Sequence, residues 1–492
     1  MSMTSQIKKN FTSFFQGHYY DRLRVAILAL AFFTVIGAYT LVKELKDSVF
    51  VNVVGLEYMP KAKLLSLVVL IPLVFFYGRL VDLLRRYQLL YVYALIYGLG
   101  GLALAFFMGH PTIGLLNTDT SPYRLYGWIF YFFMEGYSPF VVSVLWAFTN
   151  SVTGPGEVKN NYITLTASSK LGGALMAGFA WWFLSLHEVG NVCVSDVARH
   201  QLLLVFASAL LLTVPFMVML LMKYVPGRFL HGYEAAYKAE KKKAKEEDDI
   251  QDSDSSSRAR TEKSSFSQKI ESLMGKGSKI FSGLILFFKY PYVAGVFGMI
   301  FFWEIVNVIF NFLRLGIGVS ETKSAAEFGA FLYKQACLTH TIGFVFVLVG
   351  TKMIISWFGE RRSLIAIPVL TGITILTYLM FQTAFAATIA YITVRVINYA
   401  LAYPLRESLY IPTTKDVKFK AKSWIDGVGS KVSKGVGSIY NEMVIGLAPS
   451  VLFNLNVVFF GLVIGLWALM ANLLGRRFEK AVKKNEVIGV DE

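Results

Sequence analysis

Cysteine and histidine are scarce in this chain. Its 492 residues include 2 cysteines, Cys193 and Cys337, and 6 histidines. Two cysteines are too few for a disulfide framework or for a cysteine-based zinc site. The histidines show neither H-x-x-x-H nor H-x-x-x-x-D spacing, which is the kind of spacing that places two metal ligands on one helix face. We therefore expect neither a metal site nor another cofactor.

Charged residues are also few for a chain of this length. They make up 16% of the sequence, against about 25% in soluble domains. The apolar and aromatic set accounts for 55%, and the mean hydropathy is +0.53. This is more apolar surface than a soluble core would bury, so the excess requires lipid. A net charge of +16 would suggest nucleic acid in a soluble protein, but here the charge has another origin.

Stretches of about 20 apolar residues indicate membrane-spanning helices. The sequence contains twelve such stretches in two groups of six. They lie at 25–42, 63–80, 88–108, 124–148, 161–186, 201–223, 284–312, 328–356, 363–381, 383–411, 436–454 and 456–474. We expect an all-α membrane protein with a cytoplasmic arm (1–24), a six-helix half (25–224), a charged cytoplasmic linker (225–283), a second six-helix half (284–475) and a cytoplasmic tail (476–492).

The positions of Lys and Arg predict the topology. With the N-terminus inside, roughly 36 of the 48 cations lie in the tails and even-numbered connections, where the positive-inside rule expects them. Both termini are therefore expected in the cytoplasm, and nucleic-acid binding is not needed to explain the charge. The first 24 residues have no cleavable signal pattern and are shorter than a plastid transit peptide. This favours a bacterial inner membrane.

One motif after the second span resembles a pattern of major facilitator transporters. Residues 78–90, GRLVDLLRRYQLL, partly match the G-x-L-x-D-x-x-x-R sequence between helices 2 and 3 of that superfamily, and residues 352–365 look like a weaker copy after helix 8. The resemblance implies that helices 1, 4, 7 and 10 line a central cavity. Simple anchoring by positive charge is the alternative reading.

Polar residues inside the expected spans concentrate on these four helices. Ionisable groups within a membrane normally face a cavity or a partner. The cations Lys43, Lys46, Arg395 and Arg406 outnumber the glutamates Glu135 and Glu304. We therefore expect a polyanionic substrate, although a set of structural ion pairs is the alternative.

The segment from Tyr399 to Ser438 is similar to the hallmark region of the ATP/ADP translocases of plastids and obligate intracellular bacteria. It contains R-E-S-L-Y-I-P at 406–412, K-F-K-A-K-S-W-I-D at 418–426 and S-K-G-V-G at 433–437, but no Walker phosphate loop. Near the start, YTLVKELKDSV at 39–49 resembles the family's Y-x-x-L-R-D-x-K-D. FYFFMEGYSPFVVSVLWAFTNSV at 130–152 resembles its E-L-W-G-S-V motif.

The resemblance implies exchange of external ATP for internal ADP plus phosphate by alternating access. It places Lys43, Lys46 and Asp47 on charged positions of the family's motif. It places Glu135 and Glu304 on the family's two functional glutamates, and Lys422 on a functional lysine. Residues 136–139 and 167–173 depart from the family pattern. A proton-coupled importer of several nucleotides is the alternative within this class. A membrane enzyme or a transporter of another organic anion is the more distant one.

We thus expect a monomeric nucleotide transporter without enzymatic activity, in the membrane of an intracellular bacterium. Its partners are nucleotides (ATP, ADP, phosphate) and lipid. The expected substrate-binding residues are Lys43, Lys46, Asp47, Glu135, Tyr137, Glu304, Asn307, Asn311, Arg395, Asn398, Arg406 and Lys422.

Overall fold

The computed structural model describes residues 19–153, 155–186, 195–230, 289–349, 351–414, 417, 421–484 and 486–489. Most of the expected linker and N-terminal arm lies outside these residues. The secondary structure within them is helical, apart from one isolated bridge between Thr413 and Ile488. The chain is an all-helical membrane protein, as the composition predicted.

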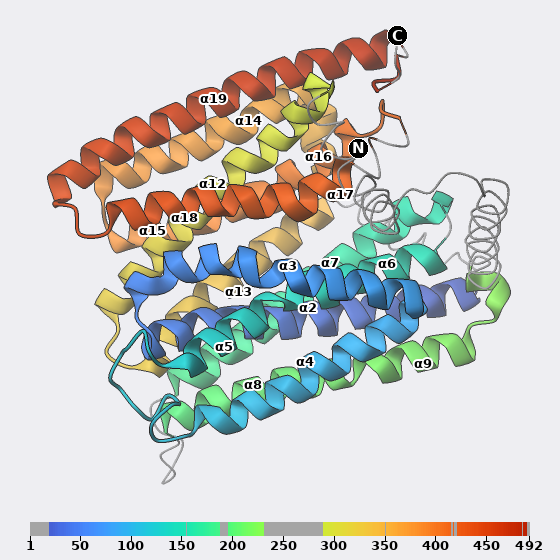
Figure 1. Cartoon of the computed structure of the whole chain (residues 1–492). Coiled ribbons are helices and arrows are strands. Elements are labelled where there is room, and N and C mark those ends of the chain that lie inside the picture. The colour runs from blue at the N-terminus through green and yellow to red at the C-terminus, as the bar shows by residue number, and fades with distance from the viewer. Residues whose placement is uncertain are drawn as a thin grey trace, which may run out of the picture.

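The first half consists of the helices before the linker, which run roughly parallel to one another (Figure 1). They are α2 (Tyr19–Val53), α3 (Met59–Leu83), α4 (Arg86–Met108), α5 (Leu125–Glu135), the π-helical turn η2 (Ser138–Val142), α6 (Ser143–Val152), α7 (Pro155–Ser185), α8 (Asp196–Leu212) and α9 (Val214–Tyr224), with 3-10 turns η1 (Leu56–Tyr58) and η3 (Gly227–Leu230). α2 begins inside the segment expected as an arm.

The second half follows the linker and lies beside the first (Figure 1). Its elements are α12 (Pro291–Glu321), α13 (Ala325–Val349), α14 (Thr351–Phe381), α15 (Ala384–Ile397), the π turn η4 (Asn398–Ala402), α16 (Tyr403–Leu409), α17 (Lys422–Trp424), the π turn η6 (Ile425–Gly429), α18 (Ser430–Val444) and α19 (Pro449–Lys484). α19 continues into the segment expected as a tail.

Eight helices in the described residues are long and apolar enough to cross a membrane. They lie at 19–53, 86–108, 125–152, 196–224, 291–321, 325–348, 357–381 and 449–484. The other four expected spans correspond to α3, α7, α15 to α16, and α17 to α18. Two of these four are divided by a π turn, which shortens each regular helical segment.

The eleventh span was wrongly placed at 436–454. The helix formed by α17, η6 and α18 covers residues 422–444, and the chain then reverses before α19 begins at Pro449. Gly446 has φ +80° in this reversal, a conformation that a residue with a side chain rarely adopts. Hydropathy misses this helix because α18 carries lysine, serine and asparagine on a face that packs against other helices rather than against lipid.

The two halves meet in two regions. α13 packs against α7 and α2, and α3 packs against α18. The contact of α2 with α7 is close because Gly172 has no side chain: a Cβ there would lie 2.3 Å from the carbonyl oxygen of Phe33. Gly173 likewise leaves room for the His340 ring of α13, 2.5 Å from where its Cβ would be. Small residues of this kind allow membrane helices to approach closely.

Gly172→Ala is expected to lower the thermal stability of the purified protein by the equivalent of about 1 to 3 kcal/mol, since its Cβ would overlap backbone atoms of α2 that cannot move alone. The measurement is a melting curve in detergent. Gly461→Ala in α19 is the matched control, because nothing lies within 4 Å of its Cβ position and alanine favours a helix. Equal melting temperatures for the two variants would contradict the close approach of α7 and α2.

Candidate functional site

A charged turn lies in the last third of α2. Glu44, Lys46 and Asp47 are buried there, and Lys43 is partly buried. A charged group at this depth costs several kcal/mol unless it has a partner or faces water. The partners of this turn come from both halves of the protein, and they define the candidate site.

Lys46 lies between two carboxylates. Its Nζ is 2.7 Å from Oε2 of Glu135 and 3.2 Å from Oδ1 of Asp47, and it is 4.2 Å from the centre of the Tyr131 ring. Oε1 of Glu135 accepts a hydrogen bond from Nζ of Lys431 at 3.3 Å. Lys46 and Glu135 belong to the first half and Lys431 to the second. We call these three residues the central bridge, because they connect the halves.

Two further contacts join α2 to α12. Glu44 is buried against Arg314, which donates a hydrogen bond to its Oε2, and it also accepts one from Nζ of Lys43 at 2.6 Å. Oδ2 of Asp47 accepts a hydrogen bond from Nδ2 of Asn311 at 3.3 Å. The charged turn of α2 is therefore tied to the second half directly at two places, and at a third through Glu135.

Glu304 has a similar position in the second half. Its Oε1 accepts a hydrogen bond from Oγ of Ser430 at 2.8 Å and lies 3.6 Å from Nζ of Lys434. Its Oε2 accepts one from Nδ2 of Asn307 at 3.4 Å. Lys431 and Lys434 are three residues apart on α18, so both project from the same side of the helix. Lys431 thus pairs with Glu135 of the first half, and Lys434 pairs with Glu304 of the second half.

The two arginines expected in span 10 lie in different surroundings. The guanidinium of Arg395 is 4.5 Å from the centre of the Tyr391 ring. Arg406 lies eleven residues further on, roughly 16 Å along a helix, and lines a small pocket with Asn398 and Trp303. The sequence offered both arginines as partners of Lys43 and Lys46, but their separation along the helix places them at different depths.

Lys422 forms an ion pair of its own. Its Nζ lies 2.5 Å from Oε2 of Glu407 and 5.4 Å from the centre of the Tyr410 ring. The distance from Lys422 to Lys431 along the helix is about 13 Å. Lys422 is therefore not one of the residues that contact the central bridge.

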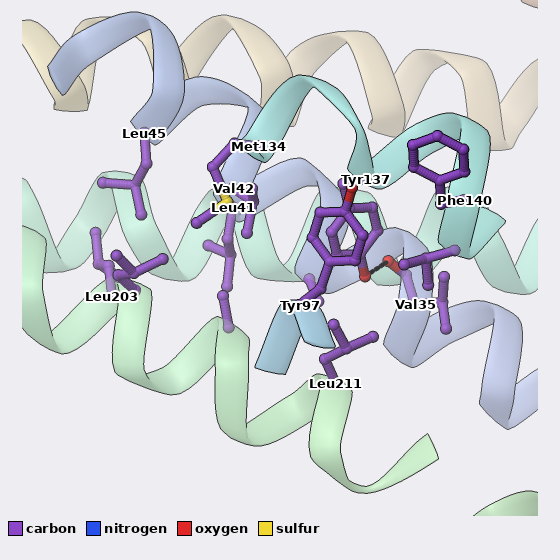
Figure 2. Packing of buried hydrophobic residues seen from close by; sticks show 14 of the residues in the cluster. Val35, Leu41, Val42, Leu45, Tyr97, Met134, Tyr137, Phe140, Leu203 and Leu211 are labelled. Atoms are coloured by element: carbon purple, nitrogen blue, oxygen red, sulfur yellow. Dashed lines mark hydrogen bonds between the residues drawn. The ribbon is translucent and has the colours of Figure 1, made fainter. Parts of the chain in front are cut away.

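Tyr137 is buried in the first half (Figure 2). Its hydroxyl donates a hydrogen bond to the carbonyl oxygen of Val35 at 3.0 Å, and its ring stacks on that of Tyr39 with a centroid distance of 5.6 Å. Leu211 and Phe140 belong to the same cluster. Packing within the first half accounts for these contacts, whereas Tyr137 was expected among the substrate-binding residues.

Spans 4 and 10 are both interrupted by a π turn. η2 contains Pro139, and η4 is followed by Pro404. Glu135 and Arg395 each lie three residues before the first residue of the turn. Proline removes a helical hydrogen bond, and a π turn accommodates the resulting gap. Span 4 and span 10 therefore share the same kind of interruption.

Sequence reasoning missed the roles of Lys431, Lys434 and Ser430. All three lie in the segment that was taken for a cytoplasmic loop. The signal was present, because the lysines at 431 and 434 have helical spacing and follow the glycine-rich stretch directly. Hydropathy alone did not predict that these residues lie in a membrane-spanning helix.

The contacts of the site leave an excess of positive charge. Among the described residues that form it, the carboxylates are Glu44, Asp47, Glu135 and Glu304. The cations are Lys43, Lys46, Arg314, Arg395, Lys431 and Lys434. Such an arrangement is suited to bind an anion by charge-assisted hydrogen bonds.

Comparison with known proteins gives a family. A family model described as TLC ATP/ADP transporter matches residues 1–270 and 322–478. The ADP,ATP carrier protein 1 of Rickettsia prowazekii (strain Madrid E) is 22% identical over 518 residues, which cover 95% of this chain and 95% of that protein.

Solved structures share the fold. The inward open xylose transporter XylE from E. coli aligns with a TM-score of 0.55 at 12% identity, covering 93% of this chain and 95% of that one. A bacterial homologue of the human lysosomal transporter Spinster, in an inward-facing and unoccupied conformation, aligns with 0.54 at 12% identity, covering 94% and 98%. At this identity the likeness concerns the fold alone, and the fold is that of major facilitator transporters, as expected.

Glu135→Gln is expected to lower the melting temperature of the purified protein by about 3 °C or more, because it removes the carboxylate that Lys46 and Lys431 share and leaves the partly buried Lys431 without this counter-ion. Glu442→Gln is the control, since the Lys61 and Glu442 side chains of its pair are 52% and 35% exposed and such pairs contribute little. Adding Lys431→Met to Glu135→Gln should restore part of the loss. A melting temperature unchanged by Glu135→Gln would show that the bridge does not join the halves.

Proposed function

The chain belongs to the TLC ATP/ADP transporter family, a family of nucleotide transporters, and we propose that it exchanges external ATP for internal ADP plus phosphate by alternating access. The observation that carries this proposal is the central bridge together with the excess of cations around it. A nucleotide with two or three phosphates supplies the negative charge that this region lacks. We place the protein in a bacterial inner membrane, as a monomer with both termini in the cytoplasm.

The central bridge gives a physical reason for exchange. Movement of one half against the other must separate Lys431 from Glu135. In a fully buried site, removing the partner of a charge costs about 3 to 5 kcal/mol. Glu135 and Lys431 are partly buried, so separating them costs up to this amount and slows the transition by up to roughly 10⁴-fold. A bound nucleotide provides replacement charge while the bridge is open. The loaded carrier then reorients quickly and the empty one slowly, so transport in one direction requires transport in the other.

The nucleoside has a different set of partners. Both carboxylate oxygens of Glu135 are occupied by lysines, whereas Nε1 of Trp303 and Oδ1 of Asn307 are buried without a hydrogen-bond partner among the described residues. An asparagine side chain pairs with the two adjacent polar groups on the edge of adenine. We therefore place the base near Asn307 and Trp303, with Glu304 beside it.

Proton coupling is the second candidate function. It is favoured by one specific contact: Glu135 accepts hydrogen bonds from two lysines, so a proton on this carboxylate would release both and open the bridge without a nucleotide. A carrier of this kind would import several nucleotides and would not require an internal one.

The test of exchange is the uptake of labelled ATP by proteoliposomes with and without internal ADP. Internal ADP is expected to raise the initial rate at least tenfold, because it removes the slow return of the empty carrier. Uptake that is equal in both preparations and increases with an inward proton gradient would replace exchange by proton coupling. Absence of uptake for every nucleotide would overturn the proposed function.

Glu135→Gln separates the two roles of this carboxylate. It keeps the shape of the side chain and removes both its charge and its ability to carry a proton. If Glu135 acts only in the bridge, the variant should reduce the requirement for internal ADP, while the competition order of unlabelled ATP, GTP and CTP and the pH dependence of uptake stay as in the wild type.

A pH dependence that is present in the wild type and absent in Glu135→Gln would instead assign the coupling proton to this residue. Asn307→Ala is the companion variant, because it should change the competition order and leave the requirement for ADP intact.

A further inference from the structure

A second group of cations lies beside the charged turn of α2. Its centre is Lys170 of α7, which is 8% exposed. The Nζ of Lys170 lies 3.2 Å from the centre of the Tyr399 ring in η4, so this lysine reaches from the first half to the second. No carboxylate within ion-pair distance of it is found in the described residues. A buried lysine in a membrane helix without such a partner needs an explanation.

The neighbours of Lys170 increase the positive charge. Lys43 of α2 and Arg395 of α15 are close enough to interact electrostatically with it. His340 of α13 is within electrostatic reach of these three cations and of Glu44, and its Nε2 is 3.3 Å from Oγ1 of Thr40. We call Lys43, Lys170 and Arg395 the α7 cation group. Three different helices contribute to it.

Only part of this charge is compensated. Glu44 pairs with Lys43, but the same carboxylate also binds Arg314. The described contacts of Lys170 and Arg395 are with the faces of tyrosine rings. Cation–π contacts give about 0.5 to 2 kcal/mol, less than the several kcal/mol that burying a charge costs. Lys170 and Arg395 therefore have no ion-pair partner among the described residues, although the carboxylate of Glu44 still attracts Arg395 from a longer distance.

The packing makes room for this group. Gly173 leaves space for the ring of His340, and Cδ of Lys170 passes 3.7 Å from the Cβ position of Gly343. Nε of Arg395 is buried and has no hydrogen-bond partner among the described residues. An unused guanidinium donor beside cations that have no ion-pair partner is typical of a site for a multiply charged oxyanion.

Lys46 is in the opposite situation. It contacts two carboxylates, Glu135 and Asp47, so its charge is already matched inside the protein. The resemblance to the family had led us to expect Lys46 among the residues that hold phosphate. Lys46 takes part in the central bridge. The cations without an ion-pair partner among the described residues lie around Lys170.

We propose that Lys43, Lys170 and Arg395 bind the terminal phosphate of the transported nucleotide, with His340 at the edge of this site, and that Lys46 acts in the central bridge. This assignment rests on the proposed nucleotide transport. Lys43 then exchanges Glu44 for phosphate, and Glu44 keeps Arg314. Because Lys170 comes from the first half and Arg395 from the second, the phosphate also links the two halves while the bridge is open.

The test is equilibrium binding to the full-length protein in detergent, with ATP, AMP, inorganic tripolyphosphate and inorganic phosphate as separate probes. Lys170→Gln is expected to weaken ATP and tripolyphosphate at least tenfold and AMP less than threefold. Lys170→Arg should recover most of the affinity, because it keeps the charge. Lys334→Gln is the matched control: this lysine of α13 is exposed, 5.6 Å from the centre of the Trp181 ring, and its loss should leave all four affinities unchanged.

The outcomes separate this assignment from the proposed function. If Lys170→Gln binds and transports ATP as well as the wild type does, the phosphate site is overturned, while nucleotide transport is not. Tripolyphosphate binding that depends on Lys170, in a protein that transports no nucleotide, supports the site and overturns the function. If Lys170→Gln does not fold, Arg395→Gln measured against the same four probes decides, and equal weakening of AMP and ATP there would overturn the site.

Discussion

The high free energy of an unpartnered charge inside a membrane is the constraint on which this structure depends. It explains why Lys46, Glu135 and Lys431 come together from three helices and two halves of the chain. It also explains why the contacts between α2 and α12 are polar at Glu44 and Asp47, although the helices around them are apolar. The same contacts that make the buried charges tolerable hold the halves together. Any movement of one half against the other therefore acts on these side chains.

This constraint shaped what the sequence was able to predict. Runs of apolar residues predicted the all-helical membrane fold and the approximate position of most helices, because a helix that faces lipid must be apolar along its length. Charged residues inside those runs pointed to the interior, and Lys46 does contact both Glu135 and Asp47. The resemblance to a transporter family, which rested on short motifs, is confirmed by a match over most of the chain.

The sequence was less informative where a helix faces only protein. α17 and the beginning of α18, up to residue 435, were taken for a loop because their lysines and serines reduce the hydropathy. Their partners lie far away in the sequence, at Glu135 and Glu304. Pairing across such distances is not visible in local composition. The same limitation applies to Lys170, whose burial depends on η4 and α13, and to Arg406 and Lys422, which share the sequence character of the other cations but lie at other depths.

The π turns in spans 4 and 10 have a mechanical consequence. Each contains one more residue per turn than a regular helix, and each follows three residues after a charged side chain of the site, Glu135 or Arg395. When such a turn moves along the helix by one position, the residue that it passes rotates by about 100° about the axis, while the helix on either side keeps its hydrogen bonds. A shift of the π turn along span 4 or span 10 can therefore turn the carboxylate of Glu135 or the guanidinium of Arg395 in a new direction, and the helix does not need to unwind.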